Sequence, residues 1–227
     1  IVVAYGKIIP QAILDIPRYA CINIHGSILP AYRWASPIQE SIKNGDTSTW
    51  LTIMYMSAGM DEWDVLNTGN VEIDKHDTSV DIFHKFEQIW ADLLMSTLTG
   101  LLSWEVQANP QDDSKASYCG KISKSEGAID FIQMSSHQIY NRFRAYTPWP
   151  GIYCFYHDKK LNLEQVCVWE ISSHTPGTVI REDKKSYWIV CADQKLLIIQ
   201  QVKLEWKSSM DILSFVNGNR DFLDYKF

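Results

Sequence analysis

The sequence lacks the features of several protein classes. No run of about 18 apolar residues occurs, so we expect no membrane-spanning helix. There is no internal repeat and no low-complexity segment, and 46% of the 227 residues are hydrophobic while 21% are charged. This composition excludes collagen, a coiled coil and intrinsic disorder, and it is typical of a globular protein of one large or two small domains.

Cysteine is sparse and unpaired in its spacing. The five cysteines are scattered, and no two of them form a C-x-x-C pair. This excludes the usual patterns of a zinc site or a redox dithiol, so we expect no bound metal. Five free thiols favour a reducing compartment, and we therefore expect a cytoplasmic protein.

The sequence also has few glycines, and it does not begin with methionine. The chain has 11 glycines, about 4.8% where about 7% is usual, but as many as nine tryptophans. It opens on Ile1-Val2-Val3 without methionine and without a signal peptide. We expect that the chain begins inside a β-strand and that preceding residues of the protein are missing.

Charge is distributed unevenly along the chain. Residues 1–118 hold 7 basic and 15 acidic side chains, a net charge of −8, whereas residues 119–227 hold 14 and 12, a net charge of +2. This asymmetry is compatible with a polyanionic partner for the second half, and equally with two ordinary solvated surfaces.

The first half alternates strand and helix patterns. Apolar runs predict strands at residues 1–5, 20–25, 51–56 and 71–73. Between them, Pro37 and Gly45 have the positions of a helix start and stop, and residues 78–81 resemble a capping box before a long amphipathic helix. Strands that alternate with helices predict an α/β fold with a parallel, partly Rossmann-like sheet.

The second half has a different pattern. A polar segment at residues 109–121 predicts a linker between a domain at 1–108 and a domain at 122–227. Beyond the breaker Thr147-Pro148-Trp149-Pro150-Gly151, short β-runs are separated by charged or glycine-containing turns, and an apolar stretch at 210–218 predicts a last helix. We therefore predict a small OB-like β-barrel.

Two polar side chains stand out in the second predicted strand. Asn23 and His25 point to one face of that strand, because side chains alternate, and they lie at its carboxyl end, where open α/β sheets bind ligands. An amide and an imidazole on one face suit oxyanion stabilisation and proton transfer. A solitary histidine near a loop is, however, more often structural or solvated.

An acidic turn follows the third predicted strand. Asp61 comes after residues 51–56 and the turn Ser57-Ala58-Gly59. If the two strands are parallel, Asp61 could reach His25, raise its pKa and fix its tautomer. The spacing by itself equally fits a solvated acidic turn.

Together these segments resemble a known family. The motifs AYGKIIP, CINIHGSILP, PIQ, LTIM and GMD, followed by YCGKISKSEGAIDF and RAYTPWPG, are similar to those of the methionyl-tRNA formyltransferases over nearly the whole chain. The Asn-x-His and Ser-x-Leu-Pro elements are shared by the enzymes of this superfamily that use 10-formyltetrahydrofolate. The PIQ and PWPG elements and the second domain point to the tRNA branch.

The resemblance implies a reaction and a set of roles. The formyl carbon on folate N10 is attacked by the α-amine of methionine on initiator tRNA. Asn23 would donate to the oxyanion, His25 would shuttle the proton, and Asp61 would orient the ring. Ser27, Ile28, Leu29 and Pro30 match the folate-contacting loop, and no metal is required.

The same resemblance implies a tRNA partner for the second domain. The candidate phosphate contacts are the basic residues Arg142, Arg144, Lys159, Lys160, Lys184 and Lys185. We expect a cytoplasmic monomer with no membrane association. Two alternatives stay open: another folate-dependent formyltransferase, acting on a nucleotide sugar or on glycinamide ribonucleotide, and an inactive fragment that only binds tRNA.

The tryptophans depart from the family pattern in one direction. Trp149 and Trp169 match family tryptophans, whereas the other seven fall where family members usually have glycine. We hypothesise a genome that reads UGA as glycine and a translation that reads it as tryptophan, and we expect Trp34 and Trp63 to be strained or to intrude on the active site. The seven positions are Trp34, Trp50, Trp63, Trp90, Trp104, Trp188 and Trp206.

Overall fold

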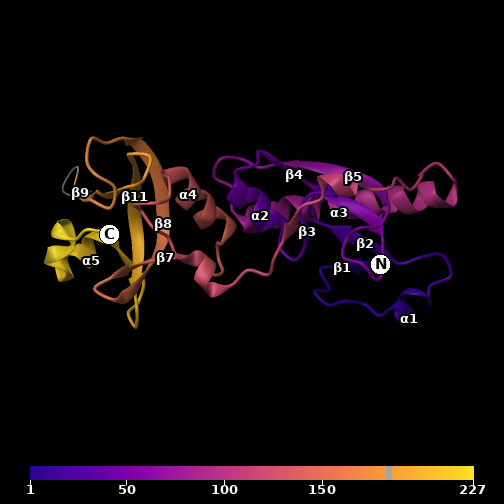
Figure 1. Ribbon diagram of the computed structural model, residues 1–227, viewed down its shortest axis with the longest axis horizontal. Coiled ribbons are helices and arrows are strands. Elements are labelled where there is room, and N and C mark those ends of the chain that lie inside the picture. Colours follow the sequence, from indigo (N-terminus) through magenta and orange to yellow (C-terminus); the bar gives the residue numbers. More distant parts are fainter. Residues whose placement is uncertain (182–185) are drawn as a thin grey trace. The chain divides into compact units, whose positions relative to one another are not determined.

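The computed structural model describes residues 1–181 and 186–227, and the side chains of residues 169 and 170 are also outside the description. The described chain divides into two compact units, Ile1–Lys121 and Ile122–Phe227 (Figure 1). No helix in the described part of the chain is both long and apolar enough to cross a bilayer.

The first unit is built on a mixed four-stranded sheet. Its strands lie in the order β1 (Val2–Val3), β2 (Ile22–His25), β4 (Ser48–Tyr55) and β5 (Val65–Glu72). Only β1 and β2 are parallel, whereas β2 pairs with β4, and β4 with β5, in antiparallel register. The predicted α/β class is confirmed, and the predicted parallel pairing is found between β1 and β2 but is wrong for β2 with β4 and for β4 with β5.

The antiparallel pairing has a local cause. A loop of nine residues joins β4 to β5 without a helix, and so short a connection returns the chain antiparallel to its partner. A strand is found within the range predicted at residues 1–5, but this edge strand β1 is only two residues long, and Ile1, Val3 and Tyr5 are exposed. The predicted strand at 71–73 is in fact the end of the eight-residue β5.

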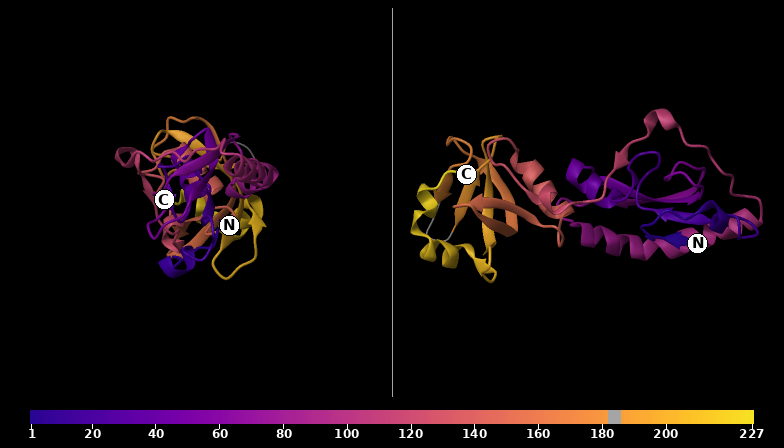
Figure 2. Two further views of the ribbon diagram at one scale, coloured as in Figure 1. Left: turned by 90° about the vertical axis from the view of Figure 1, so that its right-hand side faces the viewer. Right: turned by 60° about the horizontal axis from the view of Figure 1, so that its bottom comes forward.

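Helices pack on this sheet and begin and end at the predicted signals. Helix α2 (Pro37–Asn44) has proline in its first turn, and Gly45 follows it at φ +82°. Helix α3 (Ser79–Leu102) begins at a capping box in which Thr78 N donates to Asp81 Oδ2 at 2.8 Å. Figure 2 shows α3 running along the sheet, where it contacts β4 and β5.

The segment predicted as a linker lies against the first unit. It includes a short 3₁₀ turn (Asp113–Lys115) and the strand β6 (Tyr118–Cys119), which pairs in parallel with β3 (Arg33–Trp34). Asn109 also bridges to Val65. These backbone contacts hold residues 109–119 beside the loop that follows β2, and the site described below depends on them.

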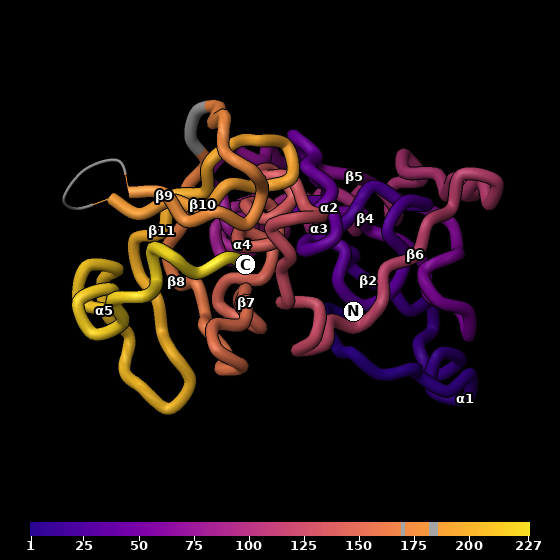
Figure 3. The backbone as a smooth tube through the Cα atoms, turned by 60° about the vertical axis from the view of Figure 1, so that its left-hand side comes forward, coloured from indigo at the N-terminus to yellow at the C-terminus, as the bar shows by residue number. Residues whose placement is uncertain are grey.

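The second unit is an antiparallel sheet with helices at its sides. Figure 3 follows its strands, which pair in the order β7-β8-β11-β10-β9, with β12 (Met210–Asp211) on β11. In the described residues no ladder joins β9 to β7, so the sheet stays open and a closed OB-like barrel is not found. The five strands in this order are β7 (Ile152–Tyr156), β8 (Lys159–Ile171), β9 (Val179–Arg181), β10 (Tyr187–Val190) and β11 (Lys195–Leu204).

Two helices cover this sheet. Helix α4 (Ser136–Ala145) contacts β8 and β11, and α5 (Ile212–Gly218) contacts β11. The predicted helix at 210–218 therefore exists, but it begins at Ile212, with Asp211 as its cap, because Met210 and Asp211 still pair with β11. The core is mainly apolar, and its fully buried side chains include Phe131, Ile139, Ile152, Leu161, Ile189, Leu197, Val202, Phe215 and Phe222.

Candidate active site

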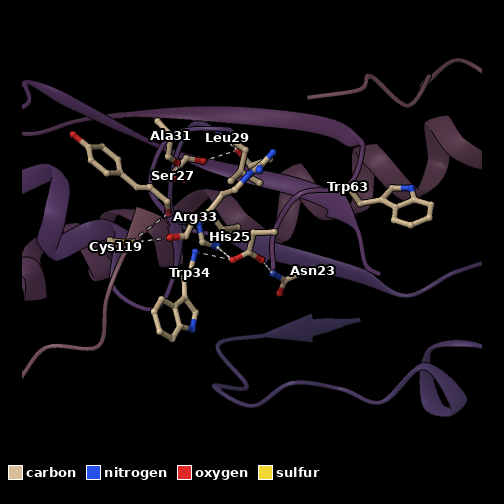
Figure 4. A network of polar contacts seen from close by, with 12 residues as sticks. Asn23, His25, Ser27, Leu29, Ala31, Arg33, Trp34, Trp63 and Cys119 are labelled. Atoms are coloured by element: carbon tan, nitrogen blue, oxygen red, sulfur yellow. Dashed lines mark hydrogen bonds and ion pairs between the residues drawn. The ribbon is translucent and has the colours of Figure 1, made fainter. Parts of the chain in front are cut away.

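The candidate site begins on one face of β2. Asn23 and His25 lie two residues apart on this strand, and the His25 side chain is only 6% exposed (Figure 4). Their shared face follows from strand alternation, as the sequence predicts. Burial of a polar ring is costly without partners, so the neighbours of His25 define what it can do.

Asp61 is the residue that joins the two. Its Oδ1 accepts a hydrogen bond from Asn23 Nδ2 at 3.3 Å, and its Oδ2 lies 3.5 Å from His25 Nδ1. The backbone N–H of residue 34 also donates to Asp61 Oδ2, at 3.0 Å. The structure therefore brings Asn23, His25 and Asp61 together as predicted, while their catalytic roles stay a prediction.

The route by which Asp61 arrives differs from the expected one. The sequence predicts two parallel strands that end side by side, but Asn23 pairs with Met54 in antiparallel register. The loop after β4 therefore starts beside the beginning of β2 and folds back along it, held by Met56 N donating to Cys21 O and Tyr55 N donating to Asp64 O. Asp61 itself has a φ of +55°, a left-handed conformation that aspartate tolerates better than most residues.

The tautomer of His25 follows from a contact that the sequence does not signal. His25 Nε2 lies 2.9 Å from the backbone oxygen of Tyr32. Because a carbonyl oxygen can only accept, Nε2 must carry a hydrogen and donate it to Tyr32. The ring is thus oriented mainly by this hydrogen bond, and Nδ1 is the nitrogen left facing Asp61.

A buried arginine and a glutamine support the Asp61 loop. Arg33 is 1% exposed, and its Nε and Nη2 donate to Gln111 Oε1 at 3.1 and 2.8 Å. Gln111 Nε2 in turn donates to the backbone oxygens of Asp61 and Trp63, at 2.9 and 2.6 Å. The sequence signals neither residue: Arg33 belongs to none of the predicted motifs, and Gln111 lies in the segment predicted as a linker.

The charge of Arg33 has a partner of its own. Its Nη2 donates to Asp113 Oδ1 at 2.7 Å and its Nη1 to Tyr118 Oη at 3.2 Å. Burial by itself lowers the pKa of Arg33, but the hydrogen bonds to Asp113 and Tyr118 outweigh it and raise the pKa above its ordinary value. The guanidinium is therefore a permanent charge beneath the site.

The loop predicted to contact folate is held in place by hydrogen bonds of its own buried residue Ser27. Ser27 is buried, its Oγ donates to Ala31 O at 2.6 Å, and its carbonyl accepts from Thr52 Oγ1 at 2.5 Å. Leu29 is buried as well, whereas Ile28 is exposed. Of the four predicted residues, Ile28 thus offers an apolar side chain to a ligand, while Ser27 and Leu29 fix the loop and Pro30 is half-buried.

The predicted phosphate contacts of the second unit differ in availability. Arg144 is buried and donates to Asn141 Oδ1, and Arg142 donates to the backbone oxygens of Glu126 and Ala128, so both hold the fold together. Lys159 is exposed, and Lys160 is half-buried over the Tyr153 ring at 3.9 Å. Lys184 and Lys185 lie outside the described residues.

No candidate metal site is found in residues 1–181 and 186–227. These residues contain no group of three or more histidine, cysteine or acidic side chains placed to hold a metal ion. The five cysteines are free, and burial raises the pKa of Cys191 to about 12. That thiol therefore stays protonated and unreactive at neutral pH.

The predicted strain at two tryptophans is found at one of them. Trp34 lies beside Asp61 with a φ of +86°, the largest of any described residue other than glycine. Trp63 is not among the residues with positive φ, and its side chain is exposed. In Figure 4 the indole of Trp63 points away from the contacts around His25.

Two protein-family models match the chain. One, described as "Formyl transferase", matches residues 1–98, and the other, described as "Formyl transferase, C-terminal domain", matches residues 121–220. The methionyl-tRNA formyltransferase of Pseudoalteromonas translucida is 38% identical in an alignment of 226 residues that covers 98% of this chain and 70% of that protein.

Solved structures share the fold. HypX from Aquifex aeolicus, in complex with tetrahydrofolic acid, superposes with a TM-score of 0.69 at 16% identity over 95% of this chain and 37% of its own. Methionyl-tRNA formyltransferase from Clostridium thermocellum gives a TM-score of 0.59 at 17% identity over 88% and 74%. Residues 1–227 thus span about 70% of the curated relative and little more than a third of HypX.

Proposed function

The chain belongs to the methionyl-tRNA formyltransferase family, and from this premise we propose that it transfers a formyl group from 10-formyltetrahydrofolate to the α-amino group of methionine on initiator tRNA. The observation that carries the proposal is the contact of one carboxylate, Asp61, with both Asn23 and His25. An amide donor, an imidazole and a carboxylate within one cluster match the needs of acyl transfer to an amine.

In the proposed reaction the amine nitrogen attacks the formyl carbon and a bond to it forms. The carbonyl oxygen then carries a negative charge, to which Asn23 Nδ2 donates a hydrogen bond. The Asn23–Asp61 contact is long, at 3.3 Å, so the amide can turn toward the oxyanion at little cost. The intermediate collapses when the bond to folate N10 breaks, and the formyl group stays on the amine.

His25 and Asp61 together are proposed to carry the proton that moves in this reaction. The attacking amine loses a proton and N10 gains one. His25 Nε2 is engaged by the carbonyl of Tyr32, so Nδ1, on the Asp61 side, is the nitrogen that exchanges protons. The distance of 3.5 Å between Nδ1 and Asp61 Oδ2 leaves that nitrogen without a tight hydrogen bond, as a proton carrier requires.

The folate donor is proposed to lie against the loop after β2. Ile28 is the exposed apolar side chain of this loop, and Ser27 and Leu29 hold the backbone in place beneath it. The solved HypX structure, whose fold matches, is in complex with tetrahydrofolic acid, which supports a folate as the donor. No residue of the cluster requires a metal for this step.

The second unit is proposed to bind the tRNA. Support comes from its net positive charge and from a hollow lined by Arg181 and Arg220, two cations that suit phosphate contacts. Lys159 adds a third exposed cation. Because the catalytic cluster comes from one chain and the substrate is a tRNA, we propose a cytoplasmic monomer.

The decisive experiment offers competing acceptors to the protein with 10-formyltetrahydrofolate. Formylation of methionyl initiator tRNA, with none of a nucleotide amino sugar or glycinamide ribonucleotide, is the expected result. Formylation of either small acceptor in place of the tRNA would contradict the proposal. Binding of tRNA without turnover at saturating donor would favour a protein that only binds.

A further inference from the structure

Gln111 uses all of its hydrogen-bonding capacity between two parts of the first unit. Its Oε1 accepts two hydrogen bonds from Arg33, and its Nε2 donates one each to the carbonyls of Asp61 and Trp63. The amide can be placed only one way round, because the guanidinium requires an acceptor and the two carbonyls require a donor. Gln111 therefore ties the loop that carries Asp61 to a buried fixed charge.

The loop that Gln111 holds has an uncommon backbone conformation at Asp61. Asp61 has a left-handed backbone conformation, at φ +55°, and its side chain must face Asn23 and His25 at the same time. A conformation of this kind persists only where surrounding contacts hold it. Near the residue, the carbonyl of Asp61 is held by Gln111 and its carboxylate by the N–H of residue 34.

We propose that Gln111, oriented by Arg33, is a positioning residue that sets where the Asp61 carboxylate lies relative to His25. This rests on the proposed function, since it assigns Gln111 a role through Asp61. A displacement of about 1 Å in such a group can cost up to about a hundredfold in rate. Neither Gln111 nor Arg33 would touch the substrate.

Gln111→Glu separates positioning from stability. The glutamate still accepts from Arg33, so the residues 109–119 stay attached to the first unit, but it cannot donate to the Asp61 and Trp63 carbonyls. We expect kcat to fall between about tenfold and a hundredfold with KM for both substrates little changed. Asp113→Asn is the matched control, because it alters a different partner of Arg33 whose side chain is 79% exposed. This variant should leave kcat unchanged.

A double-mutant cycle identifies the target of the effect. If Gln111 acts through Asp61, Gln111→Glu should cost little further rate in the Asp61→Ala protein. A full additional loss of rate in the double mutant, or a wild-type kcat for Gln111→Glu, would overturn the positioning role of Gln111. If the Asp61→Ala protein is slow in that case, the proposed function still stands. A fast Asp61→Ala protein would overturn the proposed role of Asp61 itself, and the role of Gln111 with it.

A second inference comes from the two helices of the first unit, which end in the same way. After α2, Gly45 N donates to Ile42 O and Asp46 N to Ser41 O, with Gly45 at φ +82°. After α3, Trp104 N donates to Leu101 O and Glu105 N to Gly100 O, with Trp104 at φ +65°. Both are Schellman motifs, and the left-handed position that α2 fills with glycine is filled by tryptophan after α3.

A turn in the second unit repeats the observation. Lys207 N donates to Leu204 O at 2.9 Å and closes a four-residue turn in which the third residue, Trp206, has a φ of +63°. Positive φ at the third residue of a turn favours glycine, as in type II turns. The side chains of Trp104 and Trp206 are 89% and 92% exposed, so the indoles gain almost no burial in return.

The third case lies in the candidate site. Trp34 has a φ of +86°, beyond the left-handed region of side-chain-bearing residues and close to the +82° of Gly45 and Gly177. This conformation aims the N–H of residue 34 at Asp61 Oδ2. A bulky side chain makes the same conformation costly.

We infer that residues 34, 104 and 206 are glycine in the protein as its source makes it, encoded by UGA codons that the source reads as glycine. A translation that reads UGA as tryptophan would place tryptophan at these positions. The inference does not extend to Trp50, Trp63, Trp90 or Trp188, whose φ is not positive. Trp188 does carry a buried Nε1 without a hydrogen-bond partner among the described residues, but a small residue other than glycine would relieve that too.

Peptide sequencing by mass spectrometry of the protein from its source tests the inference. Glycine at 34, 104 and 206, with TGA at those codons and TGG for Trp149, is expected. Tryptophan in any of these three peptides, or TGG at any of the three codons, would overturn it for that position.

In the recombinant chain, Trp104→Gly should raise the Tm by about 2–4 °C, whereas the matched Trp90→Gly, inside the same helix, should lower it. A lower Tm for Trp104→Gly would contradict the backbone argument.

Discussion

The two units differ in what lies at their centres. The second unit buries mainly apolar side chains, and Ser136, Arg144 and Ser172 are its buried polar ones. Its sheet includes short connections such as the two-residue turn His157-Asp158, with positive φ at both positions. The first unit buries His25, Arg33, Ser27 and Thr52, and connects them to residues that are far away in the sequence, as in the Arg33–Tyr118 pair, which is 85 positions apart.

This difference separates structure that serves stability from structure that serves chemistry. Buried polar groups cost free energy unless every one of them has a partner, and in the first unit the partners come from distant loops. Local patterns therefore describe the second unit well and the first unit poorly. Four predictions sharpen or break this contrast, beginning with the largest expected effect.

Removing the polar cluster should abolish chemistry without unfolding the first unit. Asn23→Ala, His25→Ala and Asp61→Ala should each slow formyl transfer by about a hundredfold or more, because each removes a group that acts only in the transition state. Single-turnover rates measure the loss, and folate binding by fluorescence should change far less. A near wild-type rate for His25→Ala would exclude it as the proton carrier.

The second unit should respond to salt where the first does not. If it contacts three or more tRNA phosphates, its affinity for tRNA should fall about tenfold or more between about 50 and 200 mM salt. The dissociation constant for tRNA is measured with the whole chain, and the constant for folate at the same salt concentrations is the control. An equal salt dependence for both ligands would remove the distinction between the units.

Acid should weaken a contact that holds α4 in the second unit. Burial by itself raises the pKa of Asp193, but its hydrogen bonds from Ser136 and Lys195 lower the pKa overall. A lowered pKa in the folded state means that this stabilisation is present above the unfolded value, about 3.9, and is lost as pH falls through the folded value. Urea midpoints of wild type and Asp193→Asn should therefore differ at neutral pH, and this difference should shrink as the pH falls below about 4; a difference that stays constant over that range would contradict the assignment.

The smallest effect concerns a purely local contact of the first unit. Thr78→Ala removes the capping side chain of α3, whose hydroxyl donates to Asp81 Oδ2 at 2.6 Å, and should cost about 1 kcal/mol of unfolding free energy. Chemical denaturation measures it. Formyl transfer should be unaffected, and a loss of rate would show that α3 and the site are coupled.

Local features of the fold were predictable wherever neighbours in sequence decide them. Pro37 and Gly45 bound α2, the capping box at Thr78 begins α3, and the second unit has the predicted strands after residue 151 and the predicted last helix. Strand direction was not predictable in the same way. Whether β4 runs with or against β2 depends on the path of the intervening chain, and no short pattern encodes that path.

The candidate site divides along the same line. The sequence by itself determined that Asn23 and His25 share a face, because alternation along a strand needs no other part of the chain. Only the tertiary structure decided that Asp61 meets them on a folded-back loop, that Tyr32 O sets the tautomer of His25, and that Gln111 and Arg33 hold the loop in place. These contacts join segments separated by up to 78 positions, and hydrogen bonds over such separations are fixed by the packing of whole elements and leave no local signal in the sequence.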